Sequence, residues 1–153
     1  MDLVRAVGVV LLLSSSAGTL SVPAITGAED RPSTAKENRA RAQALVKKGD
    51  ELIEAKRPAE ALAAYTQAVD ADGSYDVAYT HRALAYYALG PTSFDAARAD
   101  AAQAIRLNPS SGNAYYLRAM VNRRAGQPYQ EDLETAARLG NARAKEILAG
   151  GVE

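Results

Sequence analysis

The residues that could carry chemistry in this chain are few and scattered. His81 is the single histidine, and the chain has no cysteine, so no second His or Cys is present to share a metal ion with it. Asp70 and Asp72 lack the extended acidic loop that a calcium site needs. No G-x-S-x-G elbow and no glycine-rich phosphate loop occurs. We therefore expect no catalytic residue, no metal site, no cofactor and no enzymatic activity.

Aromatic side chains are the other candidates, because eight tyrosines and one phenylalanine could form a stacking platform. Four of the tyrosines fall on positions that pack one helix against another, and two more lie near turns. The remaining two, Tyr87 and Tyr116, are placed by helical periodicity away from that packing stripe. The 18 basic residues balance the 18 acidic ones, so nothing attracts the chain to a nucleic acid. Binding of a protein or peptide remains as the use for these side chains.

The elements that would position them are all helices, since no stretch alternates with period two. Thr34 and Glu37 form a capping box that opens a helix reaching Lys56. The second helix starts at Pro58 and ends near Asp72. Ser74 is expected to cap a third helix to Leu89, and Thr92 or Ser93 a fourth to Leu107. Three further helices are expected. The fifth ends before Gly126, the sixth runs from Asp132 to Leu139, and the seventh ends near Ala149.

Aligned pairwise, these helices repeat. The first helices carry Leu45-x-x-Lys48-Gly49-x-x-Leu52, then Tyr79-x-x-Arg82-Ala83-x-x-Tyr86, then Tyr115-x-x-Arg118-Ala119-x-x-Asn122. The second helices carry Ala61-x-x-x-Tyr65-x-x-Ala68, Ala97-x-x-x-Ala101-x-x-Ala104 and Tyr129-x-x-x-Leu133-x-x-Ala136. Small residues at the Gly49 position let the paired helices approach closely. Asp100 and Asp132 recur at one repeat position, and we interpret both as solvent-facing acids on the outer surface.

This pattern resembles the tetratricopeptide repeat (TPR), whose consensus is W-x2-L-G-x2-Y…A-x3-F…P. The resemblance implies an all-α solenoid of three helix-turn-helix repeats, at about 42–75, 76–111 and 112–141. The tail 142–149 resembles the start of a Sel1-like repeat and is expected to cap the stack. The folded domain is thus predicted to span residues 34–149, after a linker at 29–33.

Residues 1–28 differ from the rest. Arg5, the apolar run 6–13 and later small residues are typical of a secretory signal peptide, with cleavage after Ala17 or Ala28. Two alternatives remain open, an uncleaved membrane anchor and a disordered cytoplasmic tail. The first interpretation predicts an exported protein, periplasmic or secreted.

Members that this chain resembles bind peptides in a concave groove lined by their first helices. Carried over position by position, the resemblance implies that Gln43, Val46, Asp50, Ile53 and Val77 begin this lining. We predict that the binding residues are Thr80, His81, Leu84, Tyr87, Asn113, Tyr116, Met120, Arg123 and Arg124. The apolar members offer contact area, and the arginines offer donors to a carboxylate.

Chaperone-binding members hold a carboxylate with a clamp of Lys, Arg and Asn side chains. The matching positions here are occupied by Val46, Asp50, His81, Asn113 and Leu117, and none has the clamp residue. Chaperone tails are therefore disfavoured as partners. The function that we expect is an exported adaptor that binds a protein or peptide partner. The alternative is a structural, self-assembling repeat protein of the cell envelope, possible as a homo-oligomer.

Overall fold

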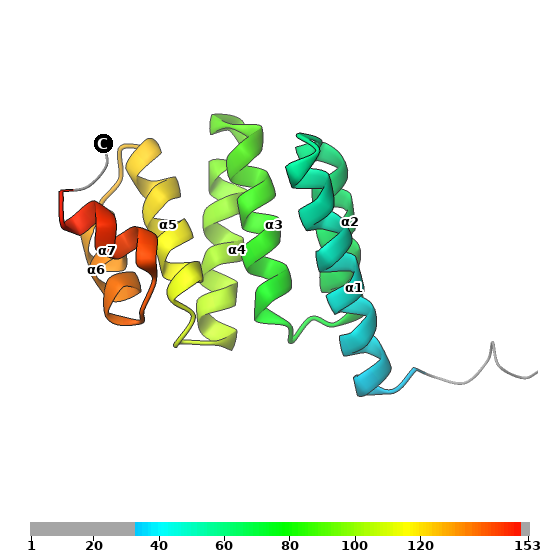
Figure 1. The fold of residues 1–153 in the computed structure, drawn as a ribbon. Coiled ribbons are helices and arrows are strands. Elements are labelled where there is room, and N and C mark those ends of the chain that lie inside the picture. The colour runs from blue at the N-terminus through cyan, green and yellow to red at the C-terminus, as the bar shows by residue number, and fades with distance from the viewer. Residues whose placement is uncertain (1–32, 151–153) are drawn as a thin grey trace, which may run out of the picture. The chain divides into compact units, whose positions relative to one another are not determined.

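The computed structural model describes residues 33–150 (Figure 1). The predicted export signal, residues 1–28, lies outside the described residues, as does nearly all of the linker. Seven α-helices and one short 3-10 helix make up the described part, and no strand occurs in it. The helices are α1 (Ala35–Glu54), α2 (Pro58–Ala71), α3 (Asp76–Leu89), η1 (Pro91–Ser93), α4 (Phe94–Leu107), α5 (Gly112–Arg124), α6 (Gln130–Arg138) and α7 (Ala142–Leu148).

Consecutive helices pack as antiparallel pairs, α1 with α2, α3 with α4 and α5 with α6, and the pairs stack side by side (Figure 1). The first helices, α1, α3 and α5, also contact one another from pair to pair. The last helix, α7, packs against α6 at the end of the stack. The all-α solenoid of three repeats with a capping helix is therefore confirmed. None of the described helices is long and apolar enough to cross a membrane.

Helix boundaries follow local signals in most places. The capping box at Thr34 is present, with the Glu37 amide donating to Thr34 Oγ1 at 3.2 Å and the Thr34 amide donating to Glu37 Oε2 at 2.8 Å. Pro58 occupies the first turn of α2, where its missing N–H is not needed. Gly90 ends α3 at a φ of 103°, a conformation that side chains with a Cβ rarely adopt. The chain then continues into the three-residue helix η1.

Two predicted caps are wrong. The N-cap of α3 is Tyr75, and the Ser74 hydroxyl donates instead to Asp72 Oδ1 at 2.7 Å. Ser93 precedes α4 but makes no side-chain capping bond. In the first case the Asp72 carboxylate, two residues earlier, accepts from both the hydroxyl and the backbone amide of Ser74 and holds this residue in the turn before the helix.

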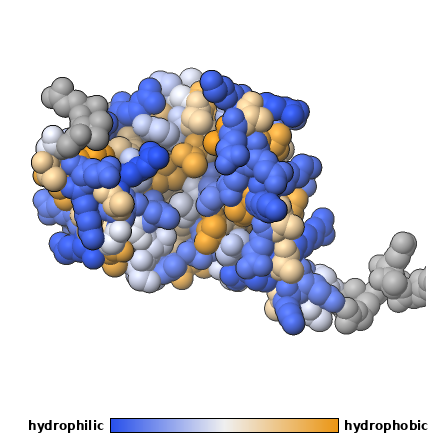
Figure 2. All heavy atoms as spheres, viewed as in Figure 1, coloured by the Kyte–Doolittle hydropathy of each residue, from blue (hydrophilic) through white to orange (hydrophobic). Residues whose placement is uncertain are grey.

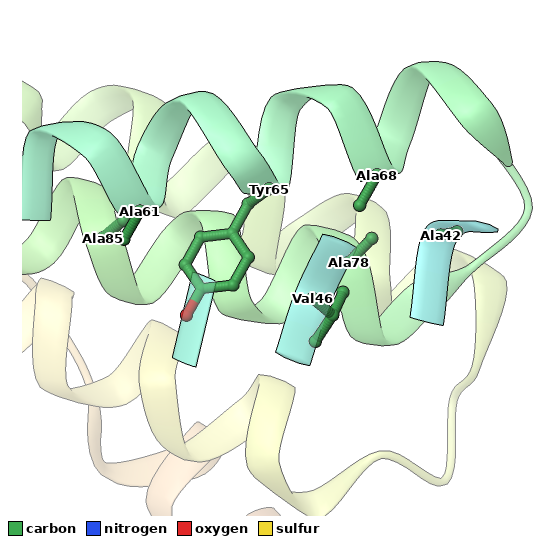
Figure 3. Close-up of a cluster of buried hydrophobic side chains, with 7 residues drawn as sticks. All are labelled: Ala42, Val46, Ala61, Tyr65, Ala68, Ala78 and Ala85. Carbon is green, nitrogen blue, oxygen red and sulfur yellow. The ribbon is translucent and has the colours of Figure 1, made fainter. Parts of the chain in front are cut away.

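The core is built mostly from alanine and is divided into three clusters. The first surrounds Tyr65, whose ring extends from α2 toward the other helices of this cluster, between Val46 and Ala61 (Figure 3). The second surrounds Phe94, and the third surrounds Leu133. Because alanine side chains are small, helices can approach closely and a few large residues fill the space that remains.

Gly49 shows how close this approach is. A Cβ on this residue would lie 2.2 Å from Cε1 of Tyr65, far inside van der Waals contact. The predicted use of a small residue at this position is therefore confirmed. Only glycine leaves room for the tyrosine ring against α1.

The outward placement predicted for Asp100 and Asp132 is wrong. Asp100 is buried and accepts two hydrogen bonds from Arg82, at 2.7 and 2.8 Å. Asp132 accepts two from Arg118, both at 2.7 Å. Each pair links the two helices of one repeat, and hydrogen bonding to the carboxylate raises the pKa of both arginines. A carboxylate at these positions faces the partner helix because an arginine at the matching position of that helix satisfies both of its oxygens.

Candidate functional site

The groove lies where α3, α5 and α7 adjoin, and consists of two pockets that share lining residues. The first has a volume of about 500 Å³ and is lined by Thr80, His81, Leu84, Asn113, Tyr116, Leu117, Gly140, Asn141, Ala142 and Arg143. The second has a volume of about 740 Å³ and is lined by Leu84, Tyr87, Tyr116, Leu117, Met120, Arg123, Ala142, Arg143, Glu146 and Ile147. Figure 2 shows apolar surface set among hydrophilic side chains in the region between α7 and α3.

Helical spacing brings the predicted residues together. Thr80, Leu84 and Tyr87 follow each other at intervals of four and three, so they lie on one face of α3. On α5, Asn113, Tyr116, Met120 and Arg123 keep the same intervals. The two faces meet across the pockets, which contain every predicted binding residue except Arg124.

The Arg124 side chain is engaged elsewhere. Its guanidinium carbon lies 5.3 Å from the ring centroid of Tyr87 and 5.8 Å from that of Phe94. The two rings stack at 5.9 Å, so the cation lies over an aromatic pair of which only Tyr87 lines a pocket. Periodicity places Arg124 beside Arg123, but it cannot reveal this aromatic pair, which comes from two different helices.

The two tyrosines singled out by periodicity are less free than the sequence predicts. Tyr87 is half-buried, because it stacks on Phe94 and packs against two core clusters. Tyr116 is also half-buried and packs against the cluster around Leu133. Each lines a pocket with part of its ring and supports the core with the rest. Leu84 is the most exposed large apolar side chain of the groove, at 38%.

The first repeat contributes nothing to either pocket. Val46 is buried in the first core cluster, and Ile53 and Val77 pack against that cluster. Val46 is thereby removed from the surface on which the resemblance places it, and Ile53 and Val77 are partly buried in the contact between α1, α2 and α3. The Asp50 side chain remains partly exposed but is held by two neighbours.

Asp50, Tyr65 and His81 form a hydrogen-bonded network beside the groove. Asp50 Oδ1 accepts from the Tyr65 hydroxyl at 2.8 Å and lies 2.6 Å from Nδ1 of His81. Because a carboxylate can only accept, Nδ1 carries the hydrogen of this contact. Burial and the bond to Asp50 raise the pKa of Tyr65, so its hydroxyl stays protonated and donating. The network joins α1, α2 and α3, and this contact was not expected for His81.

The capping helix supplies the wall that sequence reasoning missed. Ala142, Arg143, Glu146 and Ile147 of α7 face α3 and α5 across the groove. Asn141 fixes the start of α7. Its side-chain Nδ2 donates to Asn113 Oδ1 at 2.8 Å, and its Oδ1 accepts from the backbone amide of Ala144 at 2.9 Å. A signal was available, because a cap takes the place of the next first helix. Residues 143, 146 and 147 have the spacing of one face.

Chemically, the groove offers apolar contact area together with a few polar and charged groups. Within residues 33–150, no group of His, Asp and Glu side chains is arranged to hold a metal ion. His81 is occupied by Asp50, and its pocket neighbours among the described residues include no serine. The lining combines apolar side chains with a few polar groups, as is usual for ligand-binding pockets.

Searches with family models and among curated proteins find no match to this sequence. Solved structures do match. The first TPR of Spaghetti (RPAP3), bound to the HSP90 peptide SRMEEVD, shares 29% identity at a TM-score of 0.67, covering 73% of this chain and 93% of that one. The second TPR domain of human RPAP3, bound to the HSP70 peptide SGPTIEEVD, shares 26% at 0.65, covering 74% and 96%.

The chain has the tetratricopeptide-repeat fold. A third TPR domain, TPR2B of yeast Sti1 in complex with pHsp70, supports this at 25% identity and a TM-score of 0.63, covering 73% of this chain and 94% of that one. All three of these neighbours are peptide-binding domains of this repeat. The Sel1-like character of the cap stays a prediction, although α7 does cap the TPR stack.

Proposed function

We propose that this TPR domain is a non-enzymatic interaction module that binds a peptide segment of a partner protein in the groove between α3, α5 and α7. One observation carries the proposal. Residues that the resemblance to the repeat family assigns to the binding face line two adjoining pockets, and these pockets combine an exposed apolar side chain, Leu84, with polar groups at both ends. The peptide-bound neighbours of the same fold support it.

The physical basis is the distribution of apolar surface. Leu117 and Met120 form a buried floor, while Leu84, Tyr116 and Ile147 present apolar area at the rim. A peptide side chain that covers this surface gains about 25 cal/mol for each Å² removed from water. Thr80 and Asn113, which lie in the first pocket, can pair with peptide groups.

The chaperone tails bound by the neighbours are not the expected ligand. The clamp positions of chaperone-binding TPR domains fall here on Asp50 and His81, which bond to each other, and on Leu117, which is buried. A terminal carboxylate placed there would meet the Asp50 carboxylate instead of Lys and Asn donors. We expect SRMEEVD to bind this chain no more tightly than a scrambled peptide of the same composition.

The test is selection from a displayed library of randomised peptides on purified protein. Wild type should enrich a family of related sequences, and Leu84→Asp should abolish the enrichment because it places a charge on the apolar rim. Leu107→Asp is the matched control, since Leu107 is 37% exposed against 38% for Leu84 and lines neither pocket. Enrichment that survives Leu84→Asp, or that Leu107→Asp also removes, rejects the groove as the binding site.

The proposal includes export, which rests on residues 1–28 alone. An apolar run after Arg5, followed by small residues, supports a cleaved signal peptide. We therefore propose a periplasmic or secreted adaptor. Fractionation of cells that express the chain, with N-terminal sequencing of the product, tests this part separately. A product in the cytosol that still begins at Met1 would reject it without touching the groove.

A further inference from the structure

The charged side chains of the second pocket are unevenly paired. Arg123 on α5 and Arg143 on α7 both line it, both are exposed, and neither forms a hydrogen bond or ion pair with another described residue. This contrasts with Arg39, Arg82 and Arg118, each of which has a carboxylate partner. The only acid in the lining is Glu146. The pocket therefore has two positive charges for one negative charge.

We propose that the bound peptide is acidic, and that Arg123 and Arg143 receive its carboxylate while its neighbouring apolar side chain covers Leu84. The proposal rests on the proposed function and deepens it by naming the ligand class. Guanidinium groups are suited to this use, because their planar donors match the two oxygens of a carboxylate. The apolar floor beside them lowers the local dielectric, which strengthens the attraction.

The same charges give the groove a direction. At the α3 end, the Asp50 carboxylate is 43% exposed and is bonded to His81, which lines the first pocket. Arg143 lines both pockets, and Arg123 lines only the second. An acidic group is repelled by Asp50 and attracted most strongly where both arginines line the groove, so the peptide lies with its carboxylate toward the second pocket. The carboxylate site is thereby moved away from the clamp positions, to the space between α5 and α7, and α7 lies outside the three repeats.

Two sources can supply this carboxylate, an Asp or Glu side chain or the free C-terminus of the peptide. Their chemistry at the arginines is the same. They are separated by displaying the randomised library in two formats, one with a free C-terminus and one in which the C-terminus is fused to the display protein.

The experiment compares three proteins against both libraries. They are wild type, Arg123→Glu/Arg143→Glu, and the matched control Arg106→Glu/Arg138→Glu, which reverses two exposed arginines that line neither groove pocket. Circular dichroism verifies that each is folded. A second, milder variant, Arg123→Gln/Arg143→Gln, keeps the proposal testable if the charge reversal unfolds the protein.

Wild type and the control should enrich acidic peptides with an adjacent apolar residue, and the charge-reversed protein should enrich Lys or Arg instead. Binding of the selected acidic peptide should weaken about tenfold in the Gln variant, since each exposed charge pair contributes modestly. The same peptide charge on wild type and on the reversed protein overturns the inference while leaving the groove in place. Failure of every protein, wild type included, to enrich any peptide overturns the proposed function itself.

Discussion

In the α1–α2 pair a glycine lies against a tyrosine, whereas the equivalent positions of the α3–α4 pair hold Ala83 and Ala101. The second helix pair has an ion pair at positions where the first has none. Arg82 and Asp100 join α3 to α4, and the equivalent residues of α1 and α2 are the exposed Lys48 and the buried Ala64. The first pair thus depends on one large ring, and the second on two small residues and an ion pair.

The difference shows what each pair is built to do. The hydrogen-bond network of Tyr65 extends beyond its own helix pair, because its acceptor Asp50 also bonds to His81 of the next repeat. The carboxylate of Asp100 stays within its own pair. The first repeat therefore holds a groove residue, His81, in place without lining the groove itself. The second repeat leaves the exposed face of α3 available to a ligand.

Removal of the Tyr65 ring is the strongest way to break the contrast. Tyr65→Ala should lower the free energy of unfolding by about 3–5 kcal/mol, because it leaves a cavity in the first core cluster. Tyr65→Phe keeps the ring and should cost only about 1 kcal/mol for the lost hydroxyl bond. Urea unfolding measures both. Equal costs would mean that the hydroxyl network, and not the ring, stabilises this pair.

The ion pair of the second repeat comes next. Asp100→Ala should cost about 3 kcal/mol, since it leaves Arg82 buried without its carboxylate. Asp132→Ala should cost less, because Arg118 is more exposed, at 27% against 17% for Arg82. The double variant Arg82→Met/Asp100→Ala should recover most of the loss. A double variant as unstable as Asp100→Ala alone would show that the loss of stability does not come from the unpaired charge of Arg82.

Adding a Cβ at Gly49 of the first repeat, and removing one at the equivalent Ala83, should have smaller effects. Gly49→Ala should cost about 1–3 kcal/mol, because the new Cβ meets the Tyr65 ring. Ala83→Gly, at the equivalent position, should cost about 1 kcal/mol through helix propensity and lost packing. In a Tyr65→Ala background the penalty of Gly49→Ala should disappear. If it persists at full size, the two residues are not opposed in the way described.

The loops after α2 and α4 carry the smallest difference. Ser74 donates to Asp72 as Ser110 donates to Asn108, so one loop is ionised and the other is neutral. Hydrogen bonds from Ser74, together with Arg39, hold the pKa of Asp72 below its ordinary value. Its folded pKa is the lower one, so the stability that it contributes is complete above the unfolded value. That contribution is lost as pH falls below about 4.

Asp72→Asn should therefore flatten the acid side of the stability profile by a fraction of a kcal/mol to about 1 kcal/mol. Thermal melts between neutral and acidic pH measure this slope. The matched variant Asn108→Asp changes the neutral loop into an ionisable one. An acid slope unchanged by Asp72→Asn would remove Asp72 from the list of groups responsible.

Periodicity predicts the helices and their pairing, because spacing of three and four depends only on helix geometry, and the resemblance to the repeat family predicts most of the groove. It fails where contacts join residues distant in the sequence. Asp100 is predicted to face solvent because the sequence does not reveal its bond to Arg82. Arg124 is predicted to bind a ligand because the sequence does not reveal its contact with the rings of Tyr87 and Phe94. The spacing of residues 143, 146 and 147 indicates one face of α7, but its position beside α3 and α5 depends on how the last pair ends.

The central claim is that the face shared by α3, α5 and α7 binds an acidic peptide, and amide chemical shifts test it residue by residue. The isotope-labelled protein is titrated with the peptide that the library selects. Shifts should be largest at Leu84, Tyr116, Arg123 and Arg143, and absent from the outer helices α2 and α4. Shifts concentrated on α2 and α4, with those four amides unmoved, would contradict it.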